Sequence, residues 1–148
     1  MTPEQWRDRL HQSVDKIERA VVRVIPVKAG QEAKNHFQDN FRKGGFVDGG
    51  LHPWKRSKRI GTAKGADGQY GTLLSSRRHL YSAINYKAEP RKVTITNNTP
   101  YARVHNEGLR AGRGKGFIMP KRQFIGESHE LTKKVAHIIE DEINKALE

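Results

Sequence analysis

One pair of side chains in the sequence has the types and spacing for acid–base chemistry. His105 and Glu107 lie two residues apart, and an imidazole beside a carboxylate is a combination that general acid–base catalysis uses. No nucleophile or second carboxylate accompanies the pair. We therefore rank a small metal-dependent nuclease last among the hypotheses, and we expect no catalytic residues and no enzymatic activity.

The remaining histidines raise the question of a metal site. His129 and His137 are eight residues apart, more than two helical turns, whereas zinc ligands usually come at shorter spacings with a third ligand nearby. His79 and His105 have no close ligand partner either. The glycine-rich run 112–116 lacks the Gly-Lys-Ser/Thr ending of a phosphate-binding loop. We expect neither a metal nor a cofactor.

Positive charge is the strongest compositional signal. The 148 residues include 28 Lys and Arg against 16 Asp and Glu, a net charge of +12 that favours acidic or polyanionic partners. We predict partner contacts in the basic clusters formed by Lys55, Arg56, Lys58, Arg59, Arg77, Arg78, Arg110, Arg113 and Lys115. The same charges would also solvate long loops. Because no aromatic ladder or helix-turn-helix pattern accompanies them, we do not expect sequence-specific DNA recognition.

Two helices are predicted at the N-terminus. Thr2 can cap the first, Pro3 takes its first position and Gln5 completes a capping box. Its apolar stripe, Trp6, Leu10, Val14, Ile17 and Val21, falls at helical spacing, and Pro26 should end the helix. A second helix is predicted over about 29–42, with Ala33, Phe37 and Phe41 on one face and Gly44-Gly45 as its stop. We interpret both stripes as core.

The middle of the chain alternates between long loops and short strands. Mobile loops are predicted near 55–72 and 109–116, with Phe46 and Trp54 pinned to the domain before the first loop. Alternation over 80–87 and 92–96 around a turn at 89–91 predicts a β-hairpin. Residues 117–119 can form a short third strand.

The C-terminal helix has the clearest pattern. Its stripe is Leu131, Val135, Ile138, Ile139, Ile143 and Leu147, and Ser128 or Gly126 can cap it. The predicted fold class is α+β: N-terminal helices and a long C-terminal helix packed on a small antiparallel β-sheet, with long basic loops. Residues 1–148 suit a single domain.

The composition also indicates the cellular compartment in which the protein works. The chain has no Cys, which excludes disulfides and cysteine-based metal or redox chemistry. We find neither the apolar core of a signal peptide nor a run long enough to cross a bilayer. These features predict a protein made and used in the cytoplasm, with no membrane contact.

A series of short motifs in the second half of the chain resembles a known family. The series runs Leu73-Leu74-Ser75-Ser76-Arg77-Arg78-His79-Leu80, Ser82-Ala83-Ile84, Val93, Ile95, Asn97, Pro100-Tyr101-Ala102, His105, Gly108, Pro120 and Arg122-Gln123-Phe124-Ile125-Gly126. In this order, ahead of an amphipathic helix, the motifs resemble the phage virion morphogenesis family of Mu-type G proteins and P2-type tail completion proteins. That family commonly has Ser-Gly before the hairpin, where this chain has Ser75-Ser76-Arg77.

The resemblance implies a structural protein of a phage or prophage that completes the tail or joins it to the head. Such a protein would assemble in the host cytoplasm and remain in the virion, as a ring at the neck. Its partners would be tail tube and head-connector proteins, with self-association into the ring and possible non-specific DNA contact. Tyr101, His105 and Gly108 would fix the turn after the hairpin, and Pro120, Arg122 and Phe124 would anchor the last helix. The alternative is a non-specific nucleic-acid-binding module that uses the basic loops.

Overall fold

The computed structural model describes residues 1–61, 70–75 and 78–148, and the following statements concern those residues. The elements in chain order are α1 (Pro3–Arg19), η1 (Ala20–Val24), α2 (Ile25–Lys43), β1 (Gly45–Val47), β2 (Leu51–Pro53), α3 (His79–Ser82), β3 (Ile84–Glu89), β4 (Lys92–Asn97), α4 (Ala102–Glu107), β5 (Arg110–Ala111), β6 (Phe117–Ile118) and α5 (His129–Leu147). The predicted α+β class is confirmed. Instead of one sheet, the strands form three separate antiparallel pairs: β1–β2, β3–β4 and β5–β6.

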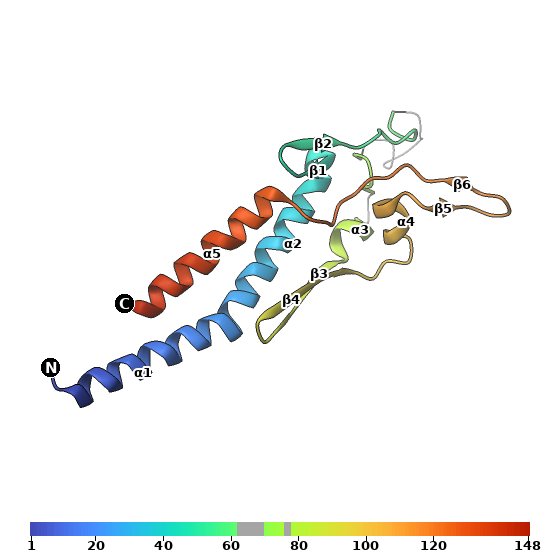
Figure 1. Cartoon of the computed structure of the whole chain (residues 1–148). Helices are drawn as coiled ribbons and strands as arrows, with labels where there is room; N and C mark the ends of the chain where they lie inside the picture. Colours follow the sequence, from blue (N-terminus) through green and yellow to red (C-terminus); the bar gives the residue numbers. More distant parts are fainter. Residues whose placement is uncertain (62–69, 76–77) are drawn as a thin grey trace.

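Figure 1 shows how these elements are arranged. The helices α1 and α2 form one long bent rod, and α5 runs antiparallel beside α2. The β3–β4 hairpin also packs on α2. The elements β1, β2, α4, β5 and β6 gather at the end of the molecule remote from both chain termini, which we call the head. No described helix has the length and apolar character needed to span a membrane.

The first helix begins as predicted but does not end at Pro26. The Thr2 hydroxyl accepts from the Gln5 backbone N–H, and the Gln5 side chain accepts from the Thr2 N–H, so the capping box is confirmed. The chain then passes through the π-helical η1 into α2. Pro26 has no N–H for the Val22 carbonyl four residues earlier, and that carbonyl accepts instead from the Arg91 N–H of the hairpin turn, at 3.3 Å. A π-bulge and a tertiary hydrogen bond therefore carry the helix past the proline, with a bend.

The prediction that the α1 stripe belongs to the core is wrong. Trp6, Leu10 and Val14 are 58%, 47% and 58% exposed, and α1 has no buried residue. The physical reason is the length of the rod: α1 extends beyond the C-terminal end of α5, so no element covers its first turns (Figure 1). Within the predicted stripe, burial begins at Ile17 and Val21, which are partly buried.

The stripe on α2 does form the core. Ala33, Phe37 and Phe41 are buried, as predicted, and Gly44 ends the helix in the left-handed conformation with φ 69°. The rest of the buried apolar cluster comes from later segments of the chain: Phe46, Trp54, Leu80, Ile84, Ala102 and Phe124. Phe41 lies at its centre, with Trp54 edge-on at 5.6 Å between ring centroids and Phe124 at 5.2 Å. The burial predicted for Phe46 and Trp54 is confirmed.

The predicted hairpin is present with a shorter first strand. β3 pairs with β4 from Ile84↔Asn97 to Glu89↔Lys92, as the alternation indicated. Its predicted first residues form α3 instead. Leu80 and Ile84 are four apart, a spacing that puts both on one side of either a helix or a strand, so the pattern could not distinguish the two.

Gly30 has a role in this packing that the sequence analysis missed. A Cβ added to Gly30 would lie 2.4 Å from the Tyr86 ring and 2.8 Å from the Val93 side chain. The glycine therefore lets the hairpin approach the backbone of α2 closely, at the cost of weaker intrinsic helix propensity.

Ser128 caps α5, as predicted, and also joins three elements. Its hydroxyl accepts from the Leu131 N–H at 3.3 Å and donates to the Val47 carbonyl at 2.6 Å. It also lies 3.1 Å from Nε2 of the buried His36. Because the hydroxyl proton goes to Val47, Nε2 of His36 is the donor in that contact. Neutral His36 thus links α2 to the start of α5.

Stability is expected to fall as the pH drops below about 6.5, the ordinary pKa of histidine. Burial, reinforced by the charge of Lys134, lowers the pKa of His36, and burial together with Arg122 lowers the pKa of His105. Between the ordinary and the lowered pKa the unfolded chain binds protons that the folded chain does not, so acid favours unfolding. The loss is at most about 1.4 kcal/mol per histidine per pH unit.

Urea unfolding at pH 7.5, 6.5 and 5.5 measures this loss, and His36→Gln should reduce its slope. An unchanged slope in that variant would show that His36 does not contribute.

Candidate interaction surfaces

The segment that contains Tyr101, His105 and Gly108 forms α4 and its C-terminal cap. Gly108 ends α4 with φ 71°, and a Cβ there would lie 2.9 to 3.0 Å from Lys121 atoms. The His105 carbonyl accepts from the Arg122 N–H at 2.8 Å. Tyr101 is partly exposed, with its ring edge-on to His105. The segment after β6 that contains Lys121 and Arg122 therefore runs directly along α4.

Asn40 and Asn106 hold the segment at residues 124–125 in place, and the sequence analysis identified neither asparagine. Asn106 Oδ1 accepts from the N–H groups of Phe124 and Ile125 at 2.9 and 3.0 Å, and its Nδ2 donates to the Ile125 carbonyl. Asn40, fully buried, donates to the Phe124 carbonyl at 3.0 Å and accepts from Val47. Both act over long sequence separations, so no local pattern could have revealed them.

The predicted partner-contact residues after β2 divide into two kinds. Lys55, Arg56 and Lys58 are exposed. Arg59 is half-buried and donates to the carbonyls of Tyr70, Gly71 and Leu74, so it ties the two described ends of this loop together. Residues 62–69 of the predicted mobile loop lie outside the described residues.

The second cluster is described only in part. Arg77 lies outside the described residues. Arg78 is exposed, has φ 48° at the start of α3, and places its guanidinium 5.8 Å from the centroid of the Tyr81 ring. Arg42 approaches the same ring at 5.7 Å.

The third cluster lies on the β5–β6 hairpin, which projects from the head (Figure 1). Residues 109–116, predicted as a mobile loop, form β5 and the turn, and β6 confirms the predicted third strand, although it pairs with β5 alone. Arg110 donates to the Lys115 carbonyl across the turn. The side chains of Arg113 and Lys115 have no ion-pair partner within the described part of the chain.

This hairpin is also strongly apolar on its returning strand. Phe117 and Ile118 are 54% and 61% exposed. The Phe117 ring lies across the turn above Gly112, where an added Cβ would be 3.2 Å from it. A pair of large exposed apolar side chains on a projecting hairpin is typical of an interaction site.

A polar cavity of about 260 Å³ brings together residues that the sequence analysis placed in separate motifs: Ser57, Arg59, Leu73, Leu74, Ser75, His79, Leu80, Tyr101, His105 and Arg122. Arg122 is buried, and its Nε donates to the Lys55 carbonyl at 2.8 Å. Burial and the neighbouring charge of Arg59 lower the pKa of Arg122. The described residues that line the cavity include no carboxylate, and Arg59 and Arg122 supply positive charge.

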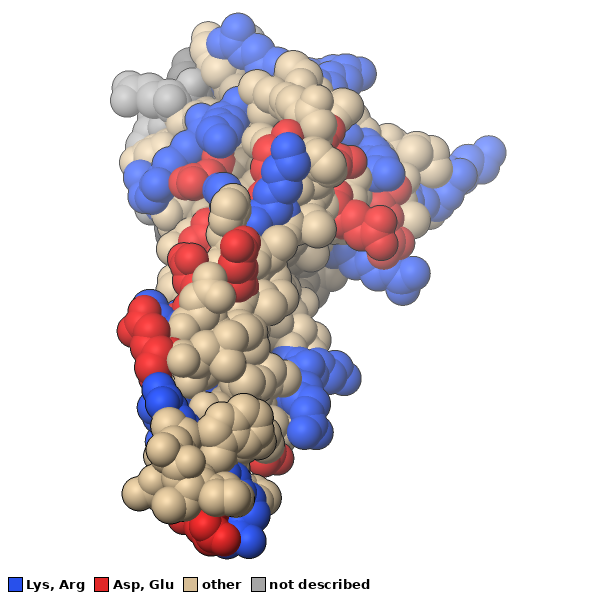
Figure 2. Space-filling view, turned by 60° about the vertical axis from the view of Figure 1, so that its left-hand side comes forward, with Lys and Arg blue, Asp and Glu red and all other residues tan. Residues whose placement is uncertain are grey.

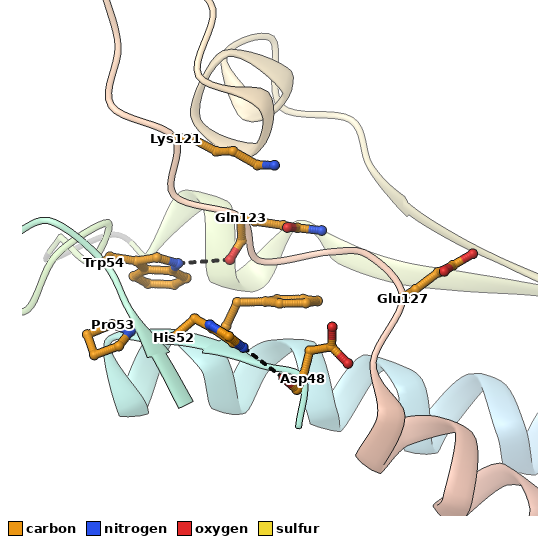
Figure 3. A pocket seen from close by; sticks show the side chains of 8 residues that line it. Asp48, His52, Pro53, Trp54, Lys121, Gln123 and Glu127 are labelled. Atoms are coloured by element: carbon orange, nitrogen blue, oxygen red, sulfur yellow. Dashed lines mark hydrogen bonds between the residues drawn. The ribbon is translucent and has the colours of Figure 1, made fainter. Parts of the chain in front are cut away.

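A groove of about 570 Å³ lies between the β1–β2 hairpin and residues 121–127 (Figure 3). The Trp54 indole N–H donates to the Gln123 carbonyl at 2.8 Å across its floor, and His52 Nε2 donates to the Asp48 carbonyl at 2.7 Å. Lys121 and Glu127 lie apart along the 121–127 wall, across from the side chains of the β1–β2 hairpin (Figure 3). The His52 imidazole and the Trp54 indole both donate to backbone carbonyls, so neither is oriented as a catalytic group in this groove. The groove therefore has the form of a binding site.

A second groove, about 670 Å³, follows the outer face of α5. We call it the α5 groove: Leu131, Val135, Ala136 and Ile139 give it an apolar floor, and Asp48 and Glu127 lie at its N-terminal end. Ile139 is 43% exposed, so the apolar stripe of α5 is only partly covered. Figure 2 shows Lys and Arg together with Asp and Glu around the upper end of the molecule, and a broad uncharged surface on the arm below it, flanked by charged side chains of both signs.

The two side chains that suggested acid–base chemistry do not act together. Glu107 pairs with Arg103 at 3.1 Å, one helical turn away. His105, two residues before it, faces a different side of α4. The described residues contain no group of three or more metal-ligating side chains that could hold an ion.

Comparison with known proteins identifies the family to which the chain belongs. Residues 3–144 match the model of the phage virion morphogenesis family, so the chain belongs to that family and functions in virion morphogenesis. The resemblance found in the sequence motifs is thereby confirmed. An 80-residue stretch is 30% identical to the "Mu-like prophage FluMu G protein 2" of Haemophilus influenzae. The stretch is 54% of this chain and 51% of that relative, so the chain spans about half the length of the curated relative it matches. No solved structure matches the chain.

Proposed function

We propose that this chain is a structural protein that completes the phage tail or joins it to the head, acting as a ring at the neck of the virion. The observation that carries the proposal is the family match over nearly the whole chain. The named prophage relative supports the same setting. Tail tube and head-connector proteins would be its partners, met first in the host cytoplasm and then in the virion.

The surface of the molecule supports a role in binding rather than in catalysis. Among the described residues that line the grooves, none is an activated nucleophile or base, whereas the head carries exposed apolar side chains together with exposed cationic side chains. We expect partner contact through the exposed basic side chains of the predicted clusters: Lys55, Arg56, Lys58, Arg78, Arg113 and Lys115. Arg59 and Arg110 donate to nearby backbone carbonyls, so we expect them mainly to stabilise the conformation of their loops.

Deletion of the gene from the phage or prophage that encodes it tests the function. The expected lysate contains filled heads and full-length tails that remain separate in negative-stain micrographs, and addition of the purified protein restores joined particles. Joined infectious particles from the deletion would contradict the proposal, and so would a lysate without heads or tubes.

Non-specific nucleic-acid binding is the second candidate, and the charge distribution favours it. Residues 108–126 contain five basic residues and no acidic residue. A module of this kind would bind any duplex with an affinity that falls steeply with salt, at a slope of about 0.9 per phosphate neutralised. Fluorescence anisotropy with two unrelated duplexes at several salt concentrations measures that slope. Absence of binding at low salt would eliminate this candidate.

A further inference from the structure

The chain carries two exposed apolar surfaces of opposite shape. The β5–β6 hairpin is a projecting ridge with Phe117 and Ile118 exposed, and the α5 groove is a hollow floored by Val135 and Ile139. An isolated two-stranded hairpin is marginally stable in water, and burial of apolar surface contributes about 25 cal/mol per Å². Both surfaces would therefore gain from being covered.

The same two surfaces also carry opposite charge. Arg113 and Lys115 lie at the turn of the hairpin, and Asp48 and Glu127 lie at the N-terminal end of the α5 groove. Glu127 forms no ion pair within the described part of the chain. Charges of opposite sign at the matching ends of a ridge and a hollow favour one orientation of the contact.

One molecule cannot make this contact with itself. The hairpin projects from the head on the side away from α5 (Figure 1), and α5 packs on α1, η1 and α2. We propose that the β5–β6 hairpin of one copy packs into the α5 groove of a second copy, with Phe117 and Ile118 against Val135 and Ile139. A contact between two different surfaces repeats from copy to copy, and it closes into a ring where the rotation permits. The proposal rests on the self-association in the proposed function and names its surfaces.

Cysteine cross-linking tests the contact directly, because the chain has no cysteine of its own. The variant carrying Ile118→Cys and Ile139→Cys should form a ladder of disulfide-linked oligomers under mild oxidation. An equimolar mixture of the two single variants should stop at the dimer. The matched control pairs Ile118→Cys with Leu147→Cys, an exposed position on the same helix, and should give no ladder. A double variant that stays monomeric, or a control that cross-links equally, would overturn the contact.

Size-exclusion chromatography with light scattering gives a second measurement. The Phe117→Ser/Ile118→Ser variant has a disabled hairpin and the Ile139→Glu variant a disabled groove, and each alone should be monomeric with an unchanged circular dichroism spectrum. Mixed together they should form a one-to-one dimer, since each retains one intact surface. A wild-type protein that is monomeric at every concentration also overturns the proposal.

The two proposals fail in different ways. A monomeric wild type that still restores joined particles to a deletion lysate would refute the copy-to-copy contact and leave the function standing. A cross-linked ladder from a protein that restores nothing would do the reverse.

Discussion

Replacing Phe124 by alanine is expected to lower the free energy of unfolding by about 3–5 kcal/mol. Phe124 is 1% exposed and packs on Phe41 at the centre of the core. Its backbone is held by Asn40 and Asn106, so the segment cannot collapse into the space that the ring leaves. Typical domains are stable by only about 5–15 kcal/mol, so this single change should remove a large share of the total. Urea unfolding followed by tryptophan fluorescence measures the loss.

The same substitution at Phe117 provides the control. Phe117 is 54% exposed, so Phe117→Ala removes few packing contacts within one molecule and should cost less than about 1 kcal/mol in dilute monomer. Equal losses at the two positions would contradict the division into a core phenylalanine and a surface phenylalanine. At high protein concentration Phe117→Ala should instead weaken self-association.

Replacing Gly108 by alanine is expected to cost about 2–4 kcal/mol. A non-glycine residue in the left-handed region costs about 1–2 kcal/mol. The added Cβ would also lie 2.9 to 3.0 Å from Cβ, Cα and N of Lys121, two of which are backbone atoms that cannot rotate away. Because Arg122 N–H donates to the His105 carbonyl beside this point, any shift also disturbs the pairing of α4 with the returning chain.

Gly44→Ala separates the two causes. Gly44 caps α2 with φ 69°, nearly the value at Gly108, but nothing lies within 4 Å of its added Cβ. This variant should therefore show the backbone cost alone, about 1–2 kcal/mol. The difference between the two thermal or urea transitions measures the steric part. If Gly44→Ala were as destabilising as Gly108→Ala, the close approach of Lys121 would not matter.

Local patterns in the sequence predicted the long helices, the β3–β4 hairpin and one side of the core. The capping box at Thr2, the stop at Gly44, the hairpin turn at Glu89–Arg91 and the cap at Ser128 all depend on residues within a few positions of each other. Helical periodicity placed Ala33, Phe37 and Phe41 on one face of α2, and that face is buried. The order of short motifs from Leu73 to Gly126 was enough to indicate the family.

Only the tertiary structure decided which apolar faces are covered. Periodicity gives a stripe to α1 and α2 alike, but burial depends on whether another element lies opposite, and the first turns of α1 extend beyond the end of α5. Pro26 ends a helix by local rules, yet Arg91 supplies the hydrogen bond that lets the rod continue. Asn40 and Asn106 hold Phe124 across long sequence separations, and Phe117 and Ile118 are left exposed on a hairpin whose two strands pair only with each other. Such contacts join residues remote in sequence, so their energies leave no trace in local spacing.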